Sequence, residues 1–114
     1  YGLEFVFLIT PETSEERIRE IDQHSNGFIY MVSSAAVTGT QSSFDTQIDY
    51  FNRINAMNLT NPRLIGFGVS NKVTKETAFG YSSGAIVGSA FIKALNETTD
   101  IETAVKLLLK NLDK

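Results

Sequence analysis

Short apolar runs alternate with amphipathic stretches along the whole chain. The runs cover residues 5–9, 28–32, 64–69 and 85–87. Continuous apolar runs of this length predict strands that are covered on both faces. No hairpin dipeptide joins one run to the next, and a helical pattern follows each of them. The alternation therefore predicts βαβ crossovers and a parallel sheet of four strand–helix units.

Polar residues at fixed spacings predict where the first two helices begin. Thr13 stands three residues before Glu16, which is the spacing of a capping box. Ser42 or Ser43 is expected to cap the second helix. The apolar face of that helix recurs every three or four residues and consists of Phe44, Ile48, Phe51 and Ile54.

The sequence also predicts where the later helices begin and end. A short helix is predicted over residues 73–79, where Gly80 stops it. A last helical region begins near Ser89, breaks at residues 96–99 and restarts with Asp100 as its cap.

Two α/β architectures are compatible with four such units. An open doubly wound sheet places its glycine fingerprint after the first strand, where this chain has Thr10-Pro11-Glu12 instead. The glycines follow the second, third and fourth strands, as in a phosphate-binding barrel. Such a barrel needs eight strands and roughly 250 residues. We therefore predict a half-barrel, with residues 1–114 forming one domain and belonging to something longer.

Composition and charge narrow the class of protein. Of the 114 residues 42% are hydrophobic and 20% are charged, as in an ordinary globular domain. The absence of cysteine fits a cytoplasmic protein and excludes thiolate metal sites. A net charge of −3 and short apolar runs give no reason to expect nucleic acid or a membrane as partner.

Three glycine-bearing segments are the strongest functional signal. They cover residues 37–40, 66–70 and 84–90, each at the carboxyl end of a predicted strand. Gly88-Ser89 opens a predicted helix, whose free N–H groups and dipole favour a phosphate. Gly39 and Gly68 are expected to complete a phosphate cradle from neighbouring loops. The cradle would consist of backbone N–H donors, because Lys72 is the only cationic residue that accompanies these segments. The alternative is that these glycines only make turns and bulges.

Catalytic groups are scarce at the predicted working face. Glu12 precedes a helix and is expected to serve its dipole. His24 falls near the end of the first helix, on the opposite side of a barrel, and is interpreted as solvated or capping. Tyr30 is the one polar strand residue that could point into a barrel mouth. We therefore predict a phosphate site without a catalytic acid or base.

These motifs together resemble one family. Residues 28–33, Val37-Thr38-Gly39, residues 64–70 and residues 84–90 are similar, in that order, to the last four strands of the tryptophan synthase α subunit. The resemblance implies a (β/α)8 barrel lyase that cleaves indole-3-glycerol phosphate by a retro-aldol step. It also implies a pyridoxal-phosphate β subunit as partner, and neither a cofactor nor a metal for this chain.

The resemblance assigns roles to individual positions. The phosphate would be held by Gly39, Phe67, Gly68, Gly88 and Ser89. Tyr30 would lie near the catalytic acids, Thr38 would belong to a mobile loop, and Ile86 would contact the ligand. The family's two catalytic carboxylates belong to earlier strands, so this chain is expected to be inactive alone.

The chain departs from the family pattern at one place, and two alternatives to this family remain open. Ala35-Ala36 stands where members of the family commonly have threonine-glycine, which narrows the backbone freedom of the loop. The chain could instead come from another sugar-phosphate barrel, or be a non-catalytic half-barrel that self-assembles. Open strand edges predict a homo-oligomer in either case.

Overall fold

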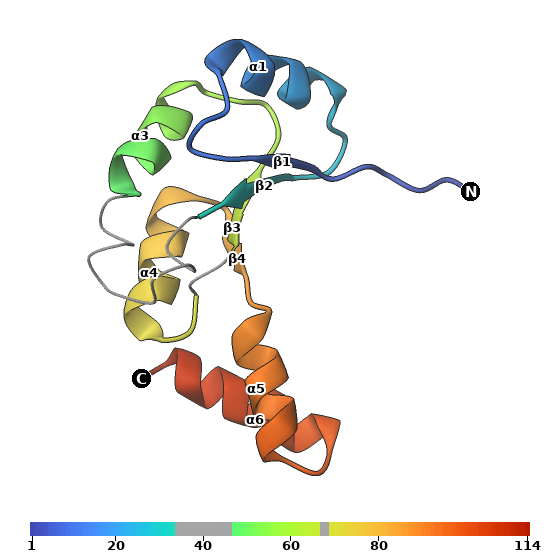
Figure 1. The fold of residues 1–114 in the computed structure, drawn as a ribbon, viewed down its shortest axis with the longest axis vertical. Coiled ribbons are helices and arrows are strands. Elements are labelled where there is room, and N and C mark those ends of the chain that lie inside the picture. Colours follow the sequence, from blue (N-terminus) through green and yellow to red (C-terminus); the bar gives the residue numbers. More distant parts are fainter. Residues whose placement is uncertain (34–46, 67–68) are drawn as a thin grey trace.

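The computed structural model describes residues 1–33, 47–66 and 69–114. Its described strands form one parallel sheet in the order β1-β2-β3-β4. The strands are β1 (Phe7–Ile9), β2 (Ile29–Val32), β3 (Arg63–Gly66) and β4 (Gly84–Ile86). Each pairs with the next in sequence, so the chain advances in one direction around an arc (Figure 1). The predicted parallel strand–helix order is confirmed.

The described helices lie mainly on the outer side of this arc (Figure 1). They are α1 (Glu15–His24), α3 (Ile48–Ala56), α4 (Lys72–Tyr81), α5 (Ser89–Glu97) and α6 (Ile101–Leu112). Helices α5 and α6 pack against each other, and α6 also contacts α4. The predicted break between the last two helices is confirmed. None of the helices in the described ranges is both long and apolar enough to cross a membrane.

The two faces of the sheet differ sharply in burial. One face packs on the helices, and its strand residues Ile9, Ile29, Met31 and Ile65 have no exposed surface. The opposite face carries Leu8, Tyr30, Val32, Leu64 and Ile86. Leu8 is 57% exposed and the other four are half-buried. The prediction that strands are covered on both faces therefore fails for the concave face.

The first helix begins one residue later than the sequence predicts. Ser14, not Thr13, has extended backbone and accepts a hydrogen bond from the Arg17 amide at 3.2 Å. Thr13 instead accepts from the Thr10 amide at 2.9 Å and so closes the turn after β1. The Thr13 hydroxyl is thus used for the turn, and the Ser14 hydroxyl, one residue nearer the helix, supplies the cap.

Two further boundary predictions are wrong for identifiable reasons. Residues 5 and 6 do not join β1, which has β2 as its neighbour on one side and no described strand on the other. Gly80 does not end its helix, because α4 continues to Tyr81. The Tyr81 and Phe51 ring centroids lie 5.6 Å apart, and this packing favours the two additional helical residues. The predicted caps Ser42 and Ser43, and Phe44, lie outside the described residues.

A carboxylate ties α1 to the loop before β3. Asp22 accepts hydrogen bonds from the Thr60 and Asn61 amides at 2.8 and 2.9 Å, and from the Asn61 side chain. Burial tends to raise the pKa of Asp22, but these donors and the Arg63 charge outweigh it, so the pKa is lowered. The contact fixes the amino end of the sheet, opposite the predicted working face.

Candidate phosphate site at the carboxyl ends of the strands

The predicted working face is the edge where the parallel strands end. Helix α5 starts three residues after β4, with Val87 and Gly88 between them. The first turn of α5 therefore lies directly after the carboxyl end of β4, the strand that pairs with β3. This placement follows from the short connection and needs no long loop.

The start of α5 has no side chain capping it. Gly88 is the N-cap residue, with φ −110° and ψ −71°, and no side-chain hydrogen bond is made there. Its carbonyl accepts from the Phe91 and Ile92 amides, both at 3.0 Å. Gly88 and Ser89 are exposed. Because the first amides of a helix have no acceptor within it, this turn offers donors to a bound anion.

Most other described helices satisfy their first turn internally. Side chains of Ser14, Asn71 and Asp100 accept from amides at the starts of α1, α4 and α6. Helix α3, whose N-cap is Gln47, shares the lack of a side-chain cap with α5. What distinguishes α5 is the combination of an uncapped start, a glycine and a position at the end of β4.

Tyr30 lies on the concave face, as the sequence predicts, and covers a glycine. It pairs with Leu64 in the sheet register, and its ring lies over Gly66 on β3. A Cβ added to Gly66 would overlap the hydroxyl oxygen and two ring carbons of Tyr30. Gly66 lies in one of the three glycine-bearing segments singled out from the sequence, and in the structure it makes room for the tyrosine.

Ile86 completes a row across three strands near the same edge. Val32, Gly66 and Ile86 are aligned in register on β2, β3 and β4. The side chains of Val32 and Ile86 therefore share the concave face with Tyr30. The structure thus brings Tyr30 and Ile86 to one face, close to the strand ends that lead to Gly88 and Ser89.

Four of the predicted site residues cannot be placed. Thr38, Gly39, Phe67 and Gly68 lie outside the described residues, as do Ala35 and Ala36. Lys72 is described, and its Nζ lies 4.0 Å from a Glu76 carboxylate oxygen on the same helix.

A clamp that the sequence did not reveal fixes the loop after β1. Arg53 on α3 donates to the carbonyls of Pro11 and Thr13 at 2.9 and 3.4 Å. The neighbouring Tyr50 hydroxyl donates to the Ile9 carbonyl at 3.2 Å. Burial raises the pKa of Tyr50, so it remains a neutral donor. Helix α3 therefore positions the first loop of the working face. The sequence predicted the helix from its apolar spacing but gave no sign of these contacts.

The described part of this face is poor in acids and bases. Glu12 is exposed in the loop after β1, and its amide donates to the Thr10 hydroxyl. Within the described ranges no three metal-ligating His, Asp or Glu side chains gather into a possible metal site.

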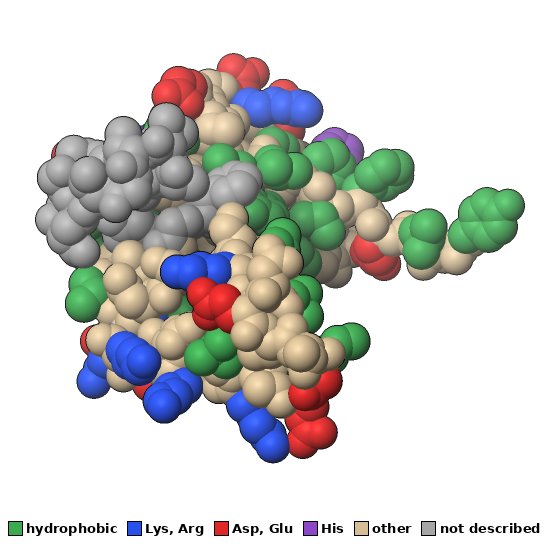
Figure 2. All heavy atoms as spheres, turned by 60° about the horizontal axis from the view of Figure 1, so that its bottom comes forward, with side chains coloured by type: hydrophobic (Ala, Val, Ile, Leu, Met, Phe, Trp, Pro, Cys, Tyr) green, Lys and Arg blue, Asp and Glu red, His purple; other side chains and the backbone are tan. Residues whose placement is uncertain are grey.

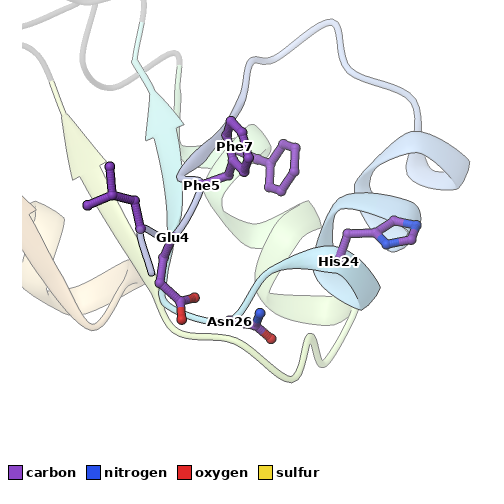
Figure 3. Close-up of a pocket in the computed structure, with 6 residues that line it drawn as sticks. Glu4, Phe5, Phe7, His24 and Asn26 are labelled. Atoms are coloured by element: carbon purple, nitrogen blue, oxygen red, sulfur yellow. The ribbon is translucent and has the colours of Figure 1, made fainter. Parts of the chain in front are cut away.

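A shallow pocket of about 150 Å³ lies at the other end of the sheet (Figure 3). It is lined by Leu3, Glu4, Phe5, Phe7, His24 and Asn26. His24 comes from the end of α1, and its ring points away from the two phenylalanines (Figure 3). The pocket is at the amino end of β1, so His24 is remote from the candidate phosphate site, as predicted.

The fold and this edge define one class of protein. Four consecutive parallel strand–helix units, with a helix starting shortly after the last strand, are half of a (β/α) barrel. The family model described as tryptophan synthase alpha chain matches residues 1–113, so the chain belongs to the tryptophan synthase alpha chain family.

Individual relatives agree with this assignment. The tryptophan synthase alpha chain of Parabacteroides distasonis is 62% identical over 110 residues, which are 95% of this chain and 43% of that protein. The Flavobacterium johnsoniae protein is 64% identical over 99 residues, covering 86% and 39%. The chain therefore spans about two-fifths of the length of the curated relatives it matches.

Solved structures show the same proportion. Tryptophan synthase subunit alpha from Campylobacter jejuni superposes with a TM-score of 0.73 at 26% identity, covering 97% of this chain and 44% of that one. A chain of the Pyrococcus furiosus tryptophan synthase complex gives a TM-score of 0.66 at 31% identity, covering 96% and 42%. The half-barrel prediction is confirmed.

Proposed function

We propose that this chain supplies the phosphate-binding half of a lyase that cleaves indole-3-glycerol phosphate to indole and glyceraldehyde 3-phosphate. The observation that carries the proposal is the start of α5. There, an exposed Gly88-Ser89 turn without a side-chain cap follows the last strand of the sheet. Membership of the tryptophan synthase alpha chain family supports this substrate class. The reaction belongs to tryptophan biosynthesis, and we expect it in the cytoplasm.

Each assigned residue has a physical role in this proposal. The Ser89 amide and hydroxyl donate to phosphate oxygens, and the dipole of α5 stabilises the dianion. Gly39, Phe67 and Gly68 close the cradle from the loops after β2 and β3. Tyr30 and Ile86 contact the glycerol and indole parts from the concave face, and Thr38 belongs to the loop that covers them.

The bond-breaking step needs groups that this half does not provide. Retro-aldol cleavage requires a base to take a hydroxyl proton and an acid to protonate the carbon that leaves. On the described part of the working face, the loop after β1 offers only the exposed Glu12 and its neighbours at the start of α1. The 114-residue chain should therefore bind phosphate esters without cleaving them. In a complete enzyme, a β subunit would receive the indole.

Substitutions at Gly88 test the proposed phosphate contact. A Cβ at Gly88 meets no atom within 4 Å and its φ is negative, so other residues fit there. Gly88→Asp places a like charge beside the phosphate, which should weaken binding of glycerol phosphate about tenfold or more in calorimetry. Gly88→Asn is the matched control, because it has the same shape without the charge. Equal affinities of these two variants would exclude phosphate from this turn.

The proposed activity has a separate test. The pure chain should release no indole from indole-3-glycerol phosphate. Adding the complementary part of the Parabacteroides distasonis protein, which carries the remaining strands, should restore release. The same mixture made with the Gly88→Asp chain should be markedly slower. Indole release by the chain alone would contradict the proposed division of the site.

A further inference from the structure

The link between α1 and β2 carries the chain's only asparagine–glycine pair. Asn26 and Gly27 follow Ser25, the C-cap residue of α1, and both are exposed. Figure 2 shows the chain's single histidine, His24 at the end of α1, on the surface on the side from which the amino-terminal segment projects. The link leads into β2, which has a paired strand on each side. It therefore belongs to the interior of the described sheet and not to an outer strand.

The reacting groups of this pair are unoccupied. In the described part of the chain, no hydrogen bond engages the Asn26 side chain or the Gly27 amide. The φ of Gly27 is not positive, and a Cβ built on it meets no atom within 4 Å. Because glycine has no side chain, nothing on Gly27 hinders its backbone nitrogen from approaching the Asn26 side-chain carbonyl.

We propose that Asn26 is a site of spontaneous deamidation. The Gly27 nitrogen attacks Cγ of Asn26, and the new N–C bond closes a cyclic succinimide. The Cγ–Nδ2 bond breaks, and the proton of the Gly27 amide leaves with the nitrogen as ammonia. Water then opens the ring: cleavage of the N–Cγ bond gives aspartate, and cleavage of the bond from nitrogen to the main-chain carbonyl carbon gives isoaspartate. Water is the sole co-reactant, and the attack is favoured because both groups belong to adjacent residues.

Other asparagines in loops lack one of these features. Asn58 is also exposed outside the helices and strands, but Leu59 follows it and places a branched side chain beside the attacking nitrogen. Asn61 is followed by Pro62, which has no amide proton, and its side chain donates to Asp22 at 2.9 Å. Asn58 is therefore the matched internal control for Asn26.

The product should disturb the entry into β2. The link is fixed at both ends, because the Ser25 hydroxyl donates to the Ile21 carbonyl at 2.7 Å and the Ile29 amide donates to the Pro62 carbonyl at 2.9 Å. Isoaspartate adds a methylene to the backbone of residues 26–28 between these ends. The new carboxylate also lies just beyond the carboxyl end of α1, where the helix dipole disfavours negative charge. Deamidation should therefore destabilise the chain.

Peptide mapping by mass spectrometry during incubation at neutral pH and physiological temperature tests the site. Asn26 should exchange its amide for a hydroxyl well before Asn58, and fragmentation should show isoaspartate as well as aspartate. Gly27→Ala should slow this reaction about tenfold or more, because a Cβ crowds the attacking nitrogen. The open space around Gly27 lets alanine fit, so the fold and the rate at Asn58 should not change.

Three results would overturn the proposal: loss of ammonia at Asn58 before Asn26, equal rates in Gly27→Ala and the unchanged chain, or an Asn26 that reacts only in denaturing urea. The last result would show that the fold protects the pair. The incubated chain should also unfold at a lower urea concentration than the fresh one, with Asn26→Asp, which adds the charge without the methylene, between them. Equal midpoints of the incubated and fresh chains would refute the effect on β2. These measurements need no phosphate ligand, so they are independent of the proposed function.

Discussion

The contact between Tyr30 and Gly66 yields a prediction with a defined sign. Gly66→Ala adds a Cβ that overlaps the Tyr30 ring, so the ring must move from its place on the concave face. Tyr30 is only half-buried, so its ring can swing outward and the chain should still fold. The substitution should nevertheless destabilise the protein, although alanine normally favours a strand over glycine.

Two opposing effects set the size of this change. Overpacking a site costs about 1–3 kcal/mol. Replacing glycine by alanine gains about 0.5–1 kcal/mol, because the unfolded chain loses conformational freedom. Gly66→Ala should therefore lower the free energy of unfolding, by up to about 2.5 kcal/mol. In a Tyr30→Ala background the overlap is gone, and the same change should be neutral or stabilise by up to about 1 kcal/mol.

Urea unfolding of the four proteins in this cycle, followed by circular dichroism at one protein concentration, gives the coupling energy. Gly80→Ala is the control, because a Cβ at Gly80 meets nothing within 4 Å inside α4. It should stabilise by about 0.5–1 kcal/mol in both backgrounds. If Gly66→Ala has the same effect with and without the Tyr30 ring, Gly66 is not reserved for the tyrosine.

Three further contacts give testable changes. Asp22→Asn should lower the free energy of unfolding by about 1 kcal/mol at pH 7. Because the folded-state pKa of Asp22 is lowered, the stabilisation from its carboxylate is present above about pH 4 and is lost as the pH falls. The difference between the two proteins should therefore shrink in thermal unfolding at acid pH. A loss that is constant down to pH 2 would contradict this. Arg53→Ala should cost about 1–2 kcal/mol and speed amide exchange in residues 10–13; unchanged exchange there would show that the clamp is not needed. Asp100→Ala should lower the thermal unfolding midpoint, because it removes the side chain that accepts from the Thr103 amide. Asp100→Asn should keep most of the stability, and equal losses in the two variants would exclude a capping role.

The order of elements could be predicted because it depends on local pattern. Apolar runs and helical spacing are repeated along the chain, and Asp100 was recognisable as a cap since a break precedes it. The start of α1 was harder, because Thr13 and Ser14 are both good caps by composition. The choice depends on which hydroxyl closes the turn with Thr10, and the sequence does not show that.

Contacts between distant elements explain the remaining differences. Asp22 and Asn61, or Arg53 and Pro11, are about forty residues apart and meet only after the sheet has formed. Gly66 belonged to a glycine-bearing segment that was interpreted as part of the phosphate site, because the motif says nothing about a tyrosine on the neighbouring strand. The sequence predicted that the concave face is buried, because apolar strand residues give the same sequence pattern whether or not another layer covers them.

An NMR titration of the 114-residue chain with glycerol phosphate tests the central claim most directly. The amides of Ser89 and Ala90 should shift in a saturable way at millimolar ligand. The amides of Glu102 and Thr103, in the first turn of the Asp100-capped α6, should stay in place and serve as the internal control. Shifts of equal size at both helix starts, or none at Ser89, would contradict the account of α5 as the phosphate-binding helix.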